Sequence, residues 1–260
     1  MSEIVYDNWY NYPQYYECFF RKETAREVRF IEWAARHLAN VKVRRVLELG
    51  CGGGRLILRL ARRGYRCYAL DNNQQALELC RRRAQRKHLP VTTLESDLAD
   101  FALPEKVELA ICTWNTIRHL LSEQAARRHL QRVAEAVCSG GLYIIGLHLL
   151  PLDVAEEAEE RWSARWGHLK LHARLRVEST DRKRRLEWLG LRLTIRSPRR
   201  TRRFECRFAL RMYTLQQFLS LIHYSGYWQI VGVYDFWYDW RRPRKLDNNL
   251  IDAVFVLRRD

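Results

Sequence analysis

The sequence predicts an α/β fold: a doubly wound, seven-stranded, mostly parallel sheet with an antiparallel last strand. Between residues 23 and 150, short apolar runs alternate with longer segments that carry the 3.6-residue period of amphipathic helices. Such alternation is typical of βαβ units, whose strands are parallel. Two apolar runs near the C-terminus predict the antiparallel end of the sheet.

The elements of the first 150 residues follow from spacing and capping residues. Residues 23–39 predict an amphipathic helix, because Val28, Ile31, Ala35 and Leu38 recur at helical spacing. Gly64 is typical of a helix end, and Asn72 or Asn73 and Ser122 are typical of helix starts. The predicted strands are 44–50, 65–71, 91–97, 107–114 and 140–149, and the helices between them are 54–64, 73–88 and 122–138.

The pattern changes after Pro151. Residues 153–167 are acidic and predict a helix. Residues 185–196 and 203–213 alternate apolar and polar side chains around a polar turn, which predicts an inserted antiparallel β-hairpin. A helix over 214–226 follows, with a capping box at Thr214 and Gln217 and a closing glycine at Gly226; the last strands are 227–237 and 250–257.

This order divides the chain into four segments. An aromatic N-terminal segment with the first helix is expected to form a lid. The core sheet follows, then the inserted helix and basic hairpin, and finally a helix and strand pair that complete the core. In order, the segments are 1–39, 40–150, 151–213 and 214–260.

Composition excludes several classes of protein. Apolar residues make up 47% of the 260 residues, and no apolar run approaches the ~20 residues of a membrane span. The acidic, aromatic N-terminus is unlike a signal or transit peptide. The seven cysteines form no C-x-x-C pair, so we expect neither a metal site nor a disulfide framework. These features predict a reducing, cytoplasmic location.

The net charge of +16 is concentrated in one region. Residues 182–211 contain twelve Lys or Arg and two Glu. Three interpretations of this basic hairpin remain open: it binds nucleic-acid phosphates, it recruits an acidic small substrate, or it is a dimerisation arm with a solvated basic face. The apolar face of each strand needs a partner, which favours packing on this chain or on a second subunit.

A glycine-rich turn follows the first core strand. Residues 46–55 read VLELGCGGGR, with glycines at 50, 52, 53 and 54. The third glycine of a dinucleotide motif should fall at position 55, which is arginine, and the Gly-Lys-Ser/Thr of a P-loop is absent. Glu48, before the turn, would repel a pyrophosphate and suits a cofactor that carries a cation. The glycines allow the backbone to approach that cofactor closely.

Two aspartates extend this site along the sheet edge. Asp71 ends the second core strand and can accept hydrogen bonds from both hydroxyls of a ribose. Asp97 ends the third and can accept one from an adenine amino group. Each could instead be an ordinary loop or capping carboxylate. In parallel sheets, ligands bind at the carboxyl ends of the strands, where all three features lie.

Four segments together resemble the motifs of class I S-adenosylmethionine-dependent methyltransferases, of the small-molecule branch. They are VLELGCGGGR (46–55), ALDNN (69–73), ESDLADF (95–101) and LAICTWNTIRHL (109–120). The resemblance covers roughly residues 15–150. It implies a Rossmann-like fold, S-adenosyl-L-methionine (SAM) as cofactor and S-adenosyl-L-homocysteine as product. The cofactor-binding residues that it implies are Glu48, Gly50, Cys51, Gly52, Gly54, Asp71, Asn72, Asp97, Leu98, Thr113 and Tyr15, with Cys51 packing beside the cofactor and Leu98 acting through its backbone.

The fourth segment lacks the Asn/Asp-Pro-Pro-aromatic signature of enzymes that methylate nucleobase nitrogens. Asn115 and Arg118 are candidate substrate-binding residues. His119 is either a general base or a structural histidine, and Tyr16 is the second candidate catalytic residue. The N-terminal aromatics would either close over the site or only attach the segment to the core.

These observations predict an enzyme that moves a methyl group from SAM to an N, O or C nucleophile of a small metabolite. One alternative is an RNA or other nucleic-acid methyltransferase that uses the basic hairpin. The other is a non-catalytic nucleic-acid-binding protein on the same fold. No membrane partner is expected, and a homodimer through the hairpin remains open.

Overall fold

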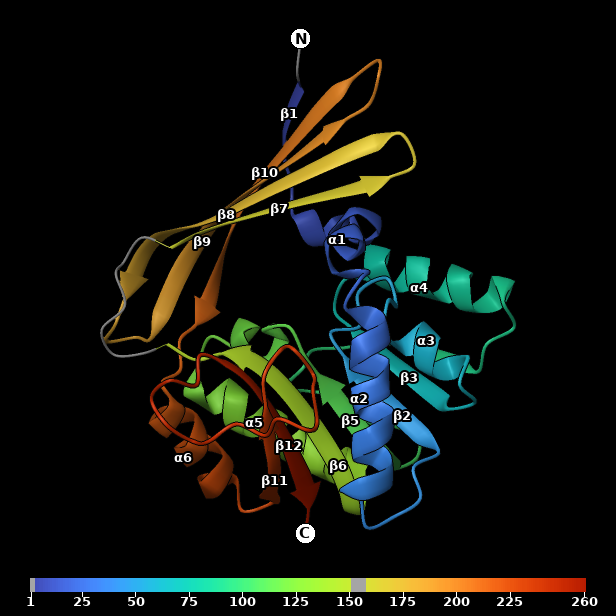
Figure 1. The fold of residues 1–260 in the computed structure, drawn as a ribbon, viewed down its shortest axis with the longest axis vertical. Coiled ribbons are helices and arrows are strands. Elements are labelled where there is room, and N and C mark those ends of the chain that lie inside the picture. Colours follow the sequence, from blue (N-terminus) through green and yellow to red (C-terminus); the bar gives the residue numbers. More distant parts are fainter. Residues whose placement is uncertain (1–2, 151–157) are drawn as a thin grey trace.

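A computed structural model describes residues 3–150 and 158–260. Its core is the predicted seven-stranded sheet, which occupies the lower half of Figure 1. The strand order is β11 (Trp228–Tyr234), β12 (Asp252–Arg259), β6 (Val137–His148), β5 (Val107–Cys112), β2 (Arg45–Leu49), β3 (Arg66–Asp71) and β4 (Val91–Glu95). The strands from β6 to β4 pair in parallel, whereas β12 is antiparallel to both β6 and β11.

Helices cover both faces of this sheet, as predicted for a doubly wound fold. Helices α5 (Glu123–Ala136) and α6 (Leu215–Ser225) pack on one face. Helices α2 (Thr24–His37), α3 (Ile57–Ala61) and α4 (Gln74–Arg86) pack on the other. The described helices include none with the length and apolar character needed to cross a bilayer.

The helix ends have the capping residues that the sequence predicts. The Asn73 side chain accepts from Ala76 N, and that of Ser122 accepts from Ala125 N. Thr214 and Gln217 form a reciprocal capping box, and Gly226 ends α6 with φ of +69°. These local hydrogen bonds satisfy backbone donors that a helix leaves free, so they are specified by the nearby sequence alone.

A second, five-stranded sheet lies above the core in Figure 1. Its order is β1 (Glu3–Tyr6), β10 (Thr201–Arg211), β9 (Leu186–Arg196), β8 (Leu169–Asp181) and β7 (Glu159–Trp166). Strands β9 and β10 are the expected antiparallel pair. They are not an isolated hairpin, because β8 and β7 extend the sheet on one side and β1 adds a parallel strand on the other.

The prediction of a helix over 153–167 is wrong where the structure describes that segment. Residues 159–166 form β7, while 151–157 lie outside the described residues. Trp162 and Ala164 face Ala173 and Leu171 across the β7–β8 pair and point into the apolar side of the sheet. That two-residue period outweighed the helical propensity of the glutamates and alanines.

The aromatic N-terminal segment lies beneath the apolar side of the second sheet. Helix α1 (Pro13–Phe20) and the 3₁₀ turn η1 (Trp9–Asn11) supply the rings. Trp9 is buried against Leu193, Ile195 and Phe204 of the sheet. The segment therefore lies between the second sheet and the core (Figure 1).

Candidate active site

The glycine-rich turn has the backbone conformation that only glycine adopts readily. Gly50, Gly52 and Gly54 have φ of +72°, +54° and +87°. Gly50 N and Cys51 N both donate to Leu70 O, at 2.8 and 3.0 Å, which anchors the turn to β3. A Cβ on Gly50 would lie 2.3 Å from Thr116 Cγ2, whereas one on Gly52 would meet no atom within 4 Å. The turn is thus packed at Gly50 and open at Gly52, where a ligand can approach the backbone.

Glu48 is buried beneath this turn. Its Oε2 accepts from Ile57 N at 2.9 Å, and burial raises the pKa of its carboxyl well above the usual range. One carboxylate oxygen of Glu48 therefore holds the start of α3, and its attraction to a ligand cation stays a prediction. Arg55 lies nearby, and its guanidinium donates to the carboxylate of Glu27 at 2.6 and 3.0 Å. The charge of Arg55 is therefore also paired within the protein.

Asp71 joins the turn to the next helix. Its Oδ2 accepts from Gly52 N at 2.7 Å, and its Oδ1 accepts from Asn73 N at 2.9 Å. Burial raises the pKa of this carboxyl. Each carboxylate oxygen has a second lone pair, so both can still accept from a ligand hydroxyl. Asn72 is exposed beside it, and Asn73 rather than Asn72 caps α4.

Asp97 and Leu98 follow the third core strand on the same edge. Asp97 is exposed and accepts from Ala99 N at 2.7 Å through Oδ1 only. Leu98 O accepts from Nδ1 of the buried His129 at 2.7 Å, which fixes the loop backbone. Asp97 and Leu98, the residues predicted to lie near the adenine, are therefore on a loop fixed by hydrogen bonds. The Oδ2 atom of Asp97 remains available to a ligand.

Cys51 has the packing role that its small side chain suggests. It is buried, and a hydrogen bond with Cys80, together with burial, raises the pKa of its thiol well above the usual range. A thiol held protonated in this way is a poor nucleophile.

Helix α1 reaches the glycine-rich turn through a buried ion pair. Arg83 Nη1 donates to Glu17, at 2.7 and 2.8 Å, and to Gly53 O at 2.8 Å. Tyr16, one turn of helix away from Phe20, faces the interior, and burial raises its pKa to about 12. The ring of Tyr15 packs against Tyr12 and against Trp166 of the second sheet; its contact with the cofactor stays a prediction.

A cavity of about 350 Å³ lies between α1, the inner face of the second sheet and the carboxyl ends of β5 and β6. Its lining is largely aromatic and includes Tyr10, Tyr16, Phe20, Trp114, Trp162 and Phe236. Asn115 and His119 line it from the segment after β5, and Thr113 is buried just before them. Thr116, in the same segment, packs on Gly50, so the segment that lines the cavity also contacts the glycine-rich turn.

Two of the polar residues that line this cavity, Asn115 and His119, are held in place by hydrogen bonds. Asn115 has φ of +66°, and its Oδ1 accepts from His148 N at 2.7 Å. His119 Nε2 is 3.1 Å from the Tyr10 hydroxyl. Burial, reinforced by Arg118, lowers the pKa of His119 to about 4, so its imidazole is neutral near pH 7. It can exchange a hydrogen bond with Tyr10 or a ligand but is a weak base.

Arg118 does not reach the cavity, contrary to its predicted role in substrate binding. Its side chain is buried in an ion pair with Glu187 of β9, and its Nε donates to Arg211 O at 2.8 Å. With its donors engaged, Arg118 connects the core to the second sheet.

Several cavity residues were not singled out from the sequence. They come from distant segments: Glu23, His148, Trp162 and Phe236. His148 ends a core strand, and that position alone could have marked it. The other three are brought in by the second sheet and by packing between segments, for which the sequence carries no local signal.

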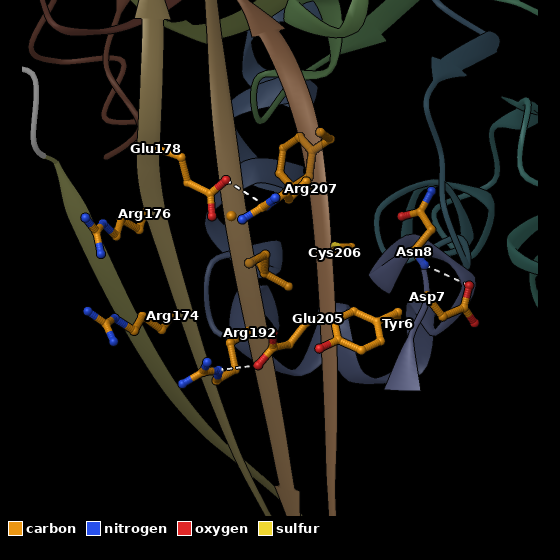
Figure 2. Close-up of a pocket in the computed structure, with 13 residues that line it drawn as sticks. Tyr6, Asp7, Asn8, Arg174, Arg176, Glu178, Arg192, Glu205, Cys206 and Arg207 are labelled. Atoms are coloured by element: carbon orange, nitrogen blue, oxygen red, sulfur yellow. Dashed lines mark hydrogen bonds and ion pairs between the residues drawn. The ribbon is translucent and has the colours of Figure 1, made fainter. Parts of the chain in front are cut away.

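A second cavity, of about 750 Å³, lies on the outer face of the second sheet (Figure 2). Four arginines line it, and most are paired with carboxylates. Arg192 donates to Glu205 at 2.7 Å, Arg207 lies 2.8 Å from Glu178, and Arg174 pairs with Glu159. Only Arg176 has no ion-pair partner among the described residues. The basic surface of the hairpin is therefore partly neutralised within the sheet.

Known proteins are similar to this chain in sequence and in fold. Residues 46–141 match the family model described as a methyltransferase domain. The ubiquinone biosynthesis O-methyltransferase of Rickettsia felis is 25% identical over 122 residues, which are 47% of this chain and 50% of that protein. The chain spans about half the length of the curated relatives that it matches.

Two solved structures cover nearly the whole chain. An S-adenosylmethionine-dependent methyltransferase from Clostridium acetobutylicum superposes with a TM-score of 0.78 at 16% identity, covering 96% of this chain and 99% of that one. The amino pentose methyltransferase CalS10 from Micromonospora echinaspora, solved with SAM bound, gives 0.72 at 18% identity, covering 100% of both chains. Residues 46–141 therefore match a methyltransferase domain, and the strand order and these likenesses show that the chain has the fold of SAM-dependent methyltransferases.

Proposed function

We propose that this chain transfers a methyl group from SAM to an N, O or C nucleophile of a small metabolite. The observation that carries the proposal is the aromatic cavity of about 350 Å³, lined by the segment after β5 that also packs on the glycine-rich turn. Its volume suits a small molecule, and the sheet, α1 and the core enclose it from different sides.

The residues around the turn fit SAM. Open space at Gly52 leaves room for the cofactor over the backbone, and Asp71 keeps two lone pairs for ribose hydroxyls. Asp97 has a free oxygen for an adenine amino group. SAM supplies an electrophilic methyl group on a sulfonium. The family likeness supports these roles, which remain part of the proposal.

The cavity residues would orient the acceptor and exclude water. Methyl transfer needs the nucleophile, methyl carbon and sulfur in line, and holding reactants in that alignment supplies much of the rate. Asn115 and neutral His119 offer hydrogen bonds to the acceptor, and the aromatic walls limit its positions. His119 and Tyr16 would therefore act mainly by positioning and shielding.

Calorimetric titration with SAM and S-adenosylhomocysteine tests the cofactor site. We expect micromolar binding by the wild type, and a loss of ~100-fold or more in Asp71→Ala, because a partly buried, charged hydrogen-bond acceptor is removed. Asp100→Ala, an exposed aspartate in the loop that also carries Asp97, is the matched control. The melting temperatures of the free variants separate lost binding from lost folding. No heat and no thermal shift with either ligand would refute the proposal.

The basic outer face keeps a nucleic-acid methyltransferase as a second candidate. The charge of residues 182–211 favours it, as does Arg176, for which the described part of the chain holds no ion-pair partner. The ion pairs to Glu159, Glu178 and Glu205 weaken it. RNA binding that falls steeply with added salt, with methyl incorporation into RNA, would favour this candidate. RNA binding without methyl incorporation would favour a non-catalytic role.

A further inference from the structure

The aromatic cavity differs in charge from the rest of the chain. Lys and Arg outnumber Asp and Glu by 46 to 30 overall. In the cavity the balance reverses: of the described residues, Glu23, Glu160 and Asp252 line it, against Arg26 as the one Lys or Arg. An acidic excess in so basic a protein indicates that the cavity favours a positively charged occupant.

Glu23 is the residue that points most directly to a positively charged ligand. It lies at the start of α2, and its Oε2 is buried with no hydrogen-bond partner among the described residues. A buried carboxylate oxygen without a partner is costly, and a donor on a bound ligand would satisfy it. Asp252, by contrast, is already engaged with His148 Nδ1.

Arg26 does not cancel this preference. Its guanidinium carbon lies 5.1 Å from the centre of the Trp237 ring, and Nη2 donates to Phe236 O at 3.4 Å. The buried Nε of Arg26 has no partner in the described part of the chain, so it can donate to an oxygen of the same ligand.

The aromatic walls complete a cation site. Phe20 packs against Trp114 and Trp162, with ring centres 4.7 and 6.3 Å apart, and Trp114 stacks on Phe236 at 5.1 Å. Ring faces attract an ammonium group, most strongly where water is excluded. Aromatic rings that lie near a carboxylate can bind a substituted ammonium ion, because both attract its positive charge.

From this arrangement we propose that the methyl acceptor is a small amine, bound with its nitrogen near Glu23 and the aromatic rings. This inference rests on the proposed function and narrows it to N-methylation. An amine that enters protonated first releases one proton to solvent. Its nitrogen lone pair then forms the bond to the methyl carbon while the carbon–sulfur bond breaks. The electron pair of that bond stays on sulfur, and the positive charge moves to nitrogen, where the cavity favours it.

Binding of matched probes tests the site without turnover. Choline and 3,3-dimethyl-1-butanol have the same shape and differ in the charge of one atom. We expect tryptophan fluorescence titration to show choline binding about tenfold more tightly, a ratio typical of a desolvated cation–π contact. Glu23→Gln should reduce that ratio towards one, while Glu178→Gln, on the outer face, should leave it unchanged. Equal binding of the two probes by the wild type would overturn the inference.

The second test measures methyl transfer from labelled SAM to an amine and to a hydroxyl acceptor. Ethanolamine should accept methyl with a higher kcat/KM than ethylene glycol, and Glu23→Gln should reduce that preference. Equal or faster transfer to the hydroxyl would overturn the inference while leaving a methyltransferase, since SAM binding is measured separately. If Glu23→Gln fails to fold, Trp162→Leu, which removes a ring contributed by the second sheet, is expected to lower the choline preference instead.

Discussion

The two faces of the five-stranded sheet have opposite chemistry. The inner face carries Trp162, Leu175 and Phe208 into the aromatic cavity, where one oxygen of Glu23 has no partner within residues 3–150 and 158–260. The outer face carries arginines, most of them paired with glutamates of the same sheet. Both follow from one rule, because successive residues of a strand point to opposite sides.

The difference shows how a binding site can be distinguished from a charged surface. The outer arginines are numerous, but carboxylates across the strands already satisfy most of them. The inner cavity also has polar residues, and two of their buried atoms, Glu23 Oε2 and Arg26 Nε, have no hydrogen-bond partner among the described residues. Unsatisfied groups in a dry site therefore indicate a ligand better than a count of charges does.

The largest expected effect is on the free energy of unfolding, when a buried arginine, Arg118, and an exposed one, Arg192, are each replaced. Arg118→Met leaves Glu187 buried without its partner, and we expect unfolding in urea to show a loss of about 3–5 kcal/mol. Arg192→Met breaks the exposed pair with Glu205 and should cost less than about 1 kcal/mol.

The double variant Arg118→Met/Glu187→Met tests the cause. It should recover much of the loss, because no unpaired charge then remains buried. Equal losses in Arg118→Met and Arg192→Met would contradict the contrast between the faces.

The next effect is the pH dependence of the inner cavity. The pKa of His119 is about 4 in the folded protein, below its ordinary value near 6.5. Between these values the unfolded chain binds more protons, so stability is full above pH 6.5 and falls as the pH drops toward 4. This loss should be on the order of 3 kcal/mol and should be clearly smaller in His119→Gln. Parallel stability curves for the two proteins would show that His119 is not buried as described.

The smallest effect is expected on the outer face. Replacing Arg174 and Arg176 together by Gln should leave SAM affinity and small-molecule methyl transfer within about twofold, since exposed pairs contribute little. A loss of transfer that depends on salt concentration would instead connect the outer cavity to substrate recognition.

The sequence predicted the seven-stranded core better than the five-stranded sheet and the N-terminal segment that lie over it. The order of strands and helices, the caps at Asn73, Ser122 and Thr214, and the positions of Gly52, Asp71 and Asp97 all depend on local pattern and spacing. Their geometry is set by neighbours in the chain or by the parallel sheet. Local signals therefore carry enough information to place them.

The five-stranded sheet and the N-terminal segment depend on long-range packing. Strand β7 was mistaken for a helix, and the hairpin was predicted without β8 and β1, because these strands are stabilised by partners far along the chain. The contacts of Arg118 and Tyr15 with the second sheet were missed for the same reason. Their partners Glu187 and Trp166 lie in the second sheet, and nothing near either residue in sequence indicates that contact.

A crystal structure with S-adenosylhomocysteine tests the central claim most directly. We expect density over Gly52, with ribose hydroxyls on Asp71, adenine near Asp97 and the sulfur directed at the aromatic cavity. Ligand density confined to the outer arginine cavity, or a cofactor whose sulfur points away from Asn115 and His119, would contradict it.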